Sequence, residues 1–397
     1  MAVKLGNGNW AVKEDKLLAY NDNSGRFFNK EFDFSRGSSA TYVGKDGLIK
    51  SAASDVPRID FSDSTNGALL LEGQSTNLIT YSSDLTSWTK IVSSVSYLEN
   101  VINPSGETFA SKITQTSSGG YVQLSRTFTG VETFSAFVKK SSSDFVRFYA
   151  GGNSVYFNIL NGTIETISGS VEDKSITDFG NGWFRISITV NSTSSSSVRI
   201  YPASSGSSTS GLNSLFVYGT QLEALSYATS YIPSLSGSAT TRLADVCNNS
   251  GSAQDFNSES GVLYFEGSAL ADDVVDKRIF LSDGTMNNYV AIGYSRFAGN
   301  IIAEIVTEGV LQTVDWGATG VNKTNNNKFA LSWGSGTMKF YVNGTQTNTE
   351  SVSSPSGLNV LEFNTAVDTL NMYAKVKDLQ VFTEAKSDEF LAALTTI

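Results

Sequence analysis

Histidine is absent from this chain of 397 residues, and cysteine occurs once, as Cys247. Without histidine, a Ser-His-Asp or Cys-His catalytic site and a histidine-ligated zinc site are both excluded. A single cysteine also excludes an intrachain disulfide, so stability must come from packing or from association between chains. An enzyme built on this sequence would have to use carboxylates, lysine or tyrosine.

Basic residues are also scarce. Lys and Arg number 28 against 38 Asp and Glu, which gives a formal net charge of -10 and a pI near 4.7. Because phosphate binding needs clustered Lys and Arg, we expect no nucleic-acid partner. No apolar run approaches the ~20 residues of a membrane-spanning helix, and the first residues lack the pattern of a secretory signal. We therefore expect a soluble protein without membrane insertion.

Proline is rare, at 5 residues, whereas glycine and the aromatic residues are plentiful. This composition is typical of short strands joined by polar turns. Apolar residues alternate with polar ones over long stretches, as in Phe184 to Val190, where Phe184, Ile186 and Ile188 fall on one face. The sequence predicts an all-β protein with two antiparallel β-sandwich domains, the first of them a sandwich or jelly roll.

The alternation is not uniform along the chain, and this predicts the domain boundaries. Residues 1–76 form an irregular N-terminal segment, either an attachment segment that packs on another chain or an extension of the first sandwich. Residues 77–232 form a jelly-roll sandwich with Ser-rich loops, residues 233–252 a linker, and residues 253–397 a second sandwich.

Two local patterns in the second sandwich predict particular elements. Phe329 to Val342 indicates a hairpin with a turn at Gly334 to Gly336, and it resembles hairpins of concanavalin-like and laminin-G-like sandwiches. At the end of the chain, Ser387 is a candidate N-cap, followed by acidic residues and by apolar residues at helical spacing. We expect a short C-terminal helix there.

Carboxylate pairs suited to glycoside hydrolysis are not evident. At ~3.3 Å per strand residue, Glu304 and Glu308 would lie about 13 Å apart, which is too far. Glu31 and Asp33 would lie about 6.6 Å apart, but on a segment without a pocket signal. A calcium-loop pattern fails, because its twelfth position is Gly73. We expect no enzyme and no cofactor, and although sandwiches of this type often hold a structural Ca²⁺, no ligand set locates one.

Tryptophan supplies the candidates for stacking against a sugar ring. Trp183 and Trp333 lie in strongly alternating strands and are interpreted as core residues. Trp88 and Trp316 border loops instead. They are therefore the candidate ligand-binding residues, with Trp316 preferred.

Short motifs between Phe32 and Asp245 resemble a linker-like segment and the jelly roll that follows it in structural proteins of tailed bacteriophages. The matching residues are Arg36, Ser38, Ala40 and Thr41; Gly47, Leu48 and Ile49; Pro57, Arg58 and Asp60; Gly67, Leu69, Leu70 and Glu72; Thr76, Asn77 and Leu78; and then Gly219 to Glu223 and Thr229 to Pro233. The C-terminal sandwich resembles these proteins by fold type alone.

This resemblance implies a virion structural protein of tail fibres, appendages or head fibres, often a trimer, exposed on the virion exterior and made in the host cytoplasm. It implies contact with other virion proteins through the N-terminal segment. Arg36, Arg58 and Asp60 could form a binding site, but an ion-paired turn that fixes the segment against the first sandwich is favoured.

The leading hypothesis is a non-enzymatic fibre or appendage subunit that adsorbs to host surface glycans, with many weak sites acting together. One alternative is a capsid or tail decoration protein that binds other virion proteins only. A second alternative is a carboxylate-based glycan depolymerase.

Overall fold

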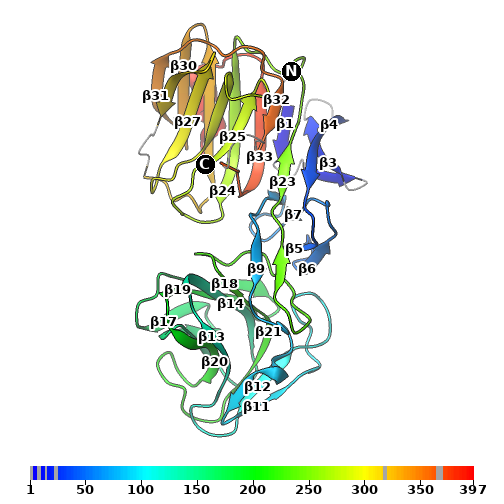
Figure 1. Ribbon diagram of the computed structural model, residues 1–397, viewed down its shortest axis with the longest axis vertical. Coiled ribbons are helices and arrows are strands. Elements are labelled where there is room, and N and C mark those ends of the chain that lie inside the picture. The colour runs from blue at the N-terminus through cyan, green and yellow to red at the C-terminus, as the bar shows by residue number, and fades with distance from the viewer. Residues whose placement is uncertain (1–2, 7–9, 14–15, 22–25, 316–319, 364–369) are drawn as a thin grey trace. The chain divides into compact units, whose positions relative to one another are not determined.

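A computed structural model describes residues 3–6, 10–13, 16–21, 26–315, 320–363 and 370–397 (Figure 1). The fold is all-β, as predicted, with antiparallel sheets arranged as β-sandwiches and a short C-terminal helix. The chain divides into two compact units. The first unit comprises residues 1–45, 52–73 and 243–397, and the second comprises residues 46–51 and 74–242.

The second unit is a sandwich of two six-stranded sheets. In order across the first sheet lie β10 (Thr89–Ile91), β13 (Tyr121–Thr127), β20 (Ser195–Ala203), β15 (Phe145–Ala150), β16 (Asn153–Asn158) and β17 (Thr163–Ser168). Across the other sheet lie β11 (Ser93–Ser96), β12 (Ser111–Gln115), β21 (Ser214–Glu223), β14 (Gly130–Lys140), β19 (Trp183–Ser192) and β18 (Asp173–Gly180). The unit also contains η1 (Leu85–Ser87) and the paired strands β9 (Ser75–Asn77) and β22 (Thr240–Arg242).

Alternation along these strands creates the core of the second unit. On β15, Val146 and Phe148 are fully buried, and on β20 the same holds for Val198 and Ile200. These side chains pack with those of the facing sheet, including Phe134, in one hydrophobic cluster. Because successive strand residues point to opposite faces, the residues between them lie on the outer face of the sheet.

The first unit contains the second sandwich. Its larger sheet has the order β31 (Thr345–Ser351), β30 (Thr337–Val342), β29 (Asn327–Gly334), β24 (Gly261–Ala269), β33 (Ala374–Phe382), β8 (Ala68–Leu70) and β7 (Ile59–Asp60), and β1 (Val3–Gly6) also pairs with β33. The facing sheet has the order β28 (Val310–Asp315), β27 (Ile301–Thr307), β26 (Tyr289–Tyr294), β25 (Lys277–Ser282) and β32 (Val360–Glu362).

The predicted hairpin and helix are confirmed. β29 and β30 pair in the register Phe329 to Val342, and their alternating apolar side chains are buried. Helix α1 (Asp388–Thr395) begins after Ser387, whose hydroxyl accepts a hydrogen bond from the backbone N–H of Phe390. Leu391 of this helix packs with Tyr341 in a small separate cluster.

Parts of the N-terminal segment belong to the fold of the first unit. β2 (Ala11–Lys13), β3 (Lys16–Asn21) and β4 (Arg26–Ser35) form a sheet with β23 (Val246–Asn248), and β5 (Ala40–Val43) follows in the same unit. The next strand, β6 (Ile49–Ala52), begins in residues 46–51 of the second unit. Trp10, Leu17 and Phe32 are buried in the same cluster as the core of the second sandwich. Residues 233–252, which the sequence assigns to a linker, contain two short strands, β22 and β23. The attachment role of the segment stays a prediction.

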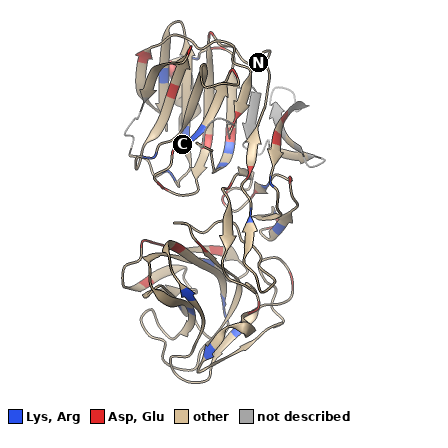
Figure 2. Ribbon diagram, viewed as in Figure 1, with Lys and Arg blue, Asp and Glu red and all other residues tan. Residues whose placement is uncertain are grey.

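Charged residues are interspersed along strands and loops of both units, without a long stretch of one sign (Figure 2). In the part of the chain that the structure describes, no group of three or more acidic or cysteine side chains is placed to hold a metal ion. None of the described helices has the length and apolar character needed to cross a membrane.

Candidate functional site

Of the two tryptophans that the sequence proposes for sugar stacking, the structure describes only Trp88. Trp88 is 1% exposed and packs in the core of the second unit, so neither face of its indole is open to a ligand in this structure. Trp316 lies outside the described residues. Trp183 and Trp333 are buried, as predicted, and their indole N–H groups donate to backbone carbonyls of Ile102 and Ser258.

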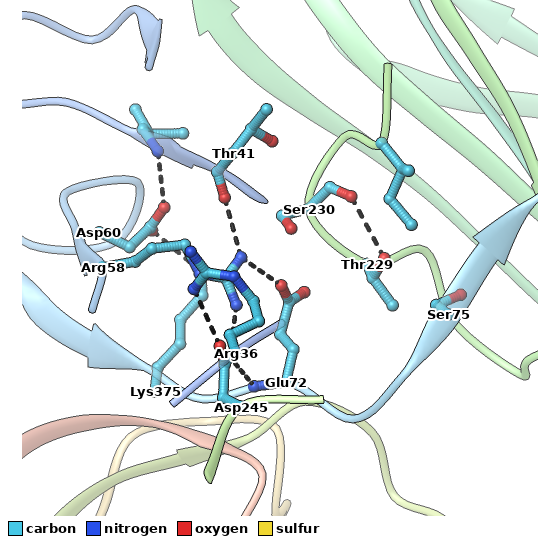
Figure 3. A network of polar contacts seen from close by, with 12 residues as sticks. Arg36, Thr41, Arg58, Asp60, Glu72, Ser75, Thr229, Ser230, Asp245 and Lys375 are labelled. Atoms are coloured by element: carbon cyan, nitrogen blue, oxygen red, sulfur yellow. Dashed lines mark hydrogen bonds and ion pairs between the residues drawn. The ribbon is translucent and has the colours of Figure 1, made fainter. Parts of the chain in front are cut away.

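Arg36 and Arg58 form a buried ion-pair network in the first unit (Figure 3). Asp245 accepts from both guanidinium groups, at 3.0 Å from Arg36 Nη1 and 2.5 Å from Arg58 Nη2. Arg58 Nη1 also contacts Glu72 Oε2 at 2.6 Å and donates to the Thr41 carbonyl at 2.9 Å. Arg36 and Arg58 are therefore ion-paired, as the sequence favours, but their partners lie inside the first unit and not in the sandwich of residues 77–232.

This network is structural in character. The side chains of Arg36, Arg58 and Asp245 have no exposed surface, so a ligand cannot reach them in this structure. Burial opposes the charge on Arg58, but Glu72 and Asp245 outweigh it and raise the pKa of the guanidinium. Asp60 lies apart from these ion pairs, and its carboxylate accepts from the backbone N–H groups of Val43 and Ser62.

A different cluster lies on the outer face of the first sheet of the second unit, and we call it the tyrosine–arginine face. It consists of Tyr121 on β13, Arg147 and Tyr149 on β15, Tyr156 on β16, and Arg199 and Tyr201 on β20. Its members alternate with core residues along their strands. Tyr156 and Tyr201 are buried, whereas the other four are half-buried.

Strand register brings these residues together. Arg147 lies opposite Tyr201 on one side and Tyr156 on the other, and Tyr149 lies opposite Arg199. Gln123 of β13 is the partner of Arg199 on the next strand. Two adjacent rows of the sheet thus carry aromatic rings, guanidinium groups and an amide on one face.

Each guanidinium group lies over tyrosine rings. Arg147 Cζ is 4.9 Å from the ring centre of Tyr201, and Arg199 Cζ is 4.4 Å from that of Tyr149. The rings of Tyr121 and Tyr201 are themselves 4.4 Å apart. Cation–π contacts of this kind contribute about 0.5–2 kcal/mol each and hold the rings in place.

Hydrogen bonds fix the guanidinium group of Arg199. Arg199 Nε donates to Ser197 Oγ at 2.7 Å, and its Nη1 donates to Tyr201 Oη at 3.2 Å. Burial opposes the charge of Arg199, but its contacts with Tyr201, Tyr121 and Tyr149 raise its pKa. Burial raises the pKa of Tyr201 against the effect of Arg199, so this phenol is neutral at neutral pH.

A braced pair of loops adjoins the face next to Tyr121 and Tyr201. Gln115 Nε2 donates to the carbonyls of Gly120, Pro202 and Thr209, and the Gly119 N–H also donates to Thr209. The loop before β13 and the loop after β20 are therefore tied together. This bracing favours a preformed surface over a mobile one.

The chemistry of the face suits binding rather than bond cleavage. Aromatic rings can pack on the C–H face of a sugar, and guanidinium, amide and phenol groups can form hydrogen bonds to its hydroxyls. Glycoside hydrolysis requires two carboxyl groups. The six strands of this sheet, all of them described, contain a single acidic residue, Glu165.

No family model and no curated protein matches the sequence of this chain. Among solved structures, it is similar to the Ruminococcus gnavus IT-sialidase CBM40 at 17% identity, covering 37% of this chain and 93% of that one, with a TM-score of 0.32. It is similar to Domain 4 of AbnA, a GH43 extracellular arabinanase from Geobacillus stearothermophilus, at 12% identity, covering 40% and 78%, with a TM-score of 0.31. Likenesses at these scores carry no functional argument for this chain.

The face was missed from the sequence, although a signal for it exists. The tripeptide pattern Arg-x-Tyr occurs on β15 as Arg147 to Tyr149 and on β20 as Arg199 to Tyr201. Either copy alone indicates a strand with a polar outer face. Only the pairing of β15 with β20 turns the two copies into one surface.

Proposed function

We propose that this chain is a non-enzymatic glycan-binding protein and that its tyrosine–arginine face contacts the sugar. One observation carries the proposal. Four tyrosines and two arginines gather on the outer face of one sheet, where they place aromatic rings and guanidinium groups on a single surface. Aromatic residues and arginine are also the types that dominate binding hot spots.

The resemblance of residues 32–245 to bacteriophage structural proteins supports a place for this protein on the exterior of a virion. There it would act as a fibre or appendage subunit that adsorbs to host surface glycans. Other virion proteins would bind the N-terminal segment, and a homotrimer would present several sugar sites at once. Repeated weak sites raise the overall affinity without any new contact.

Binding of the full chain to immobilised bacterial surface oligosaccharides, neutral and acidic, tests the proposal. Tyr149→Ala removes a ring that lies under Arg199, and we expect binding to weaken about tenfold, the size of a moderate hot spot. Tyr97→Ala is the matched control. Tyr97 is also half-buried and packs on Phe109, 5.6 Å away, but it follows β11 of the other sheet.

Each outcome assigns a different function. Binding that Tyr149→Ala reduces and Tyr97→Ala does not supports the proposal. Binding that neither variant changes places the sugar elsewhere on the chain. Absence of binding to every oligosaccharide favours a decoration protein, and release of reducing ends from a polysaccharide would establish a depolymerase.

A further inference from the structure

We propose that the sugar bound by the tyrosine–arginine face carries a carboxylate and that Arg147 binds it. This inference rests on the proposed function and adds the chemical class of the ligand. Two observations on the described residues support it, the bonding of Arg147 and the balance of charge on its sheet. The general geometry of a guanidinium group then selects the kind of anion.

Among the described residues, Arg147 has no side-chain hydrogen-bond partner, whereas Arg199 has two. Its guanidinium group lies 4.9 Å from the ring centre of Tyr201 and 5.5 Å from that of Tyr156. None of its N–H donors bonds to another described residue, and Nε is buried without a partner. A half-buried charged group in this position has lost part of its hydration without replacing it.

Three other arginines of the same unit each have a polar partner within the protein. Arg126 binds the carboxylate of Glu132 at 3.2 Å, and Arg185 donates to the carbonyl of Thr229. Arg199 donates to Ser197 and Tyr201. Arg147 is thus held by tyrosine rings, while its polar edge forms no hydrogen bond to the residues that the structure describes.

The charge on this sheet is opposite in sign to that of the whole chain. The chain has a formal net charge of -10. The six strands of the sheet carry the basic residues Lys90, Arg126, Arg147 and Arg199, against the single acidic residue Glu165. Because Arg126 is already paired with Glu132, Arg147 and Arg199 provide the positive potential at the face.

The geometry of a guanidinium group selects among anions. A guanidinium group is planar. When one of its two faces lies against an aromatic ring, the N–H groups along its edge still point outward in a flat fork. That fork matches the two oxygens of a carboxylate, which also lie in a plane. A sugar that bears a carboxylate can therefore stack on a tyrosine and pair with Arg147 at the same time.

The test uses an array of bacterial polysaccharide fragments, in which each carboxylated fragment is also printed after chemical reduction of its carboxyl group to a hydroxymethyl group. We expect the full chain to bind carboxylated fragments and to lose about tenfold or more in affinity for their reduced forms. Since this comparison uses the unaltered protein, it does not depend on how a variant folds.

Variants assign the effect to Arg147. Arg147→Gln should lose most of the preference for a carboxylated fragment over its reduced form, and its binding should weaken less with added NaCl, because only Arg199 still supplies positive charge at the face. Arg147→Lys keeps the charge but not the fork, so we expect intermediate affinity. Lys112→Gln is the control, because Lys112 also lies over an aromatic ring, that of Phe216 at 5.6 Å, on the other sheet.

The two proposals fail in distinguishable ways. If the chain binds neutral fragments and Arg147→Gln does not change that binding, the proposal of a carboxylated ligand is overturned, while the proposal of a sugar site stands. Binding confined to phosphorylated or sulfated fragments would overturn the carboxylate in favour of another anion. Failure of the unaltered chain to bind any fragment would overturn the proposed function itself.

Discussion

The two units bury carboxylates in different ways. In the first unit, Asp245 is 0% exposed and is neutralised by two arginines that are themselves buried. In the second unit, Glu223 is also 0% exposed, but neutral groups hold it. Ser75 and Thr229 donate hydroxyl hydrogen bonds to one oxygen at 2.6 Å each, and Gln221 donates to the other at 2.7 Å.

This difference matters for how each unit responds to mutation and to pH. Loss of one member of an ion-pair network leaves a buried charge unbalanced, which costs more than the network contributes. Neutral donors satisfy a carboxylate without balancing its charge. Burial therefore raises the pKa of Glu223 despite its hydrogen bonds. The first unit should be the more sensitive to single substitutions, and the second should show the clearer dependence on pH near this group.

The largest effect is expected for Asp245→Asn. This change removes the negative charge shared by Arg36 and Arg58, and we expect the first unit to lose about 3–5 kcal/mol of stability. Cys247 provides a local reporter, because it is fully buried two residues away and burial raises the pKa of its thiol. Its alkylation rate should rise in the variant. Unchanged alkylation, together with unchanged hydrogen exchange in β4 and β23, would contradict a central role for the network.

Glu223→Gln should have an intermediate effect confined to the second unit. The side-chain amide of the variant places an N–H₂ group against donors that bond to a carboxylate oxygen in the unaltered protein. We therefore expect the free energy of unfolding to fall by about 1–3 kcal/mol at neutral pH. The measurement is hydrogen exchange in β14 and β21 at increasing urea concentration, which gives the urea midpoint at which these strands become exposed. Equal losses in both units would break the comparison drawn above.

The pH dependence follows from the sign of the shift at Glu223. Its pKa in the folded state lies above the ordinary value of 4.5, so the folded state binds the proton more tightly. This group therefore contributes stability that is fully present below pH 4.5 and is lost as the pH rises through the folded pKa. Glu223→Gln cannot titrate, and its urea midpoint should vary less over that range. Parallel pH profiles for the two proteins would refute this assignment.

The smallest effect is expected for Lys339→Ala in the first unit. Lys339 pairs with Asp388 at 2.5 Å, but both side chains are substantially exposed. Water screens such a pair, and its removal should cost less than about 1 kcal/mol. Thermal unfolding of this variant beside Asp245→Asn compares an exposed ion pair with a buried one in the same unit. A similar loss for the two would show that burial does not set the cost.

The sequence predicts those parts of the fold that have a local periodic signal. The hairpin of β29 and β30 and helix α1 follow from spacing and capping within about fifteen residues. The packing of the N-terminal segment with residues after 242 has no such signal, because its pairs, such as Phe34 with Cys247, are far apart in the chain. Trp88 shows the same limit, since a loop position does not reveal that the ring turns inward.

The tyrosine–arginine face could be predicted only in part. Residues such as Arg147 and Tyr149 are recognisable as members of an outer strand face. Their meeting with Arg199 and Tyr201 depends on which strands become neighbours and in which register. Neither is fixed by alternation, because shifting a strand by two residues keeps the same side chains outward but changes every partner.

The placement of the second unit inside the sequence of the first has a consequence for synthesis on the ribosome. Residues 74–242 emerge before Asp245, which lies 209 positions after its partner Arg36. Closing so long a loop is slow and entropically costly until the intervening chain has become compact. We expect the second unit, whose translation is completed earlier, to fold first, while Arg36 and Arg58 stay hydrated until their shared carboxylate has been translated.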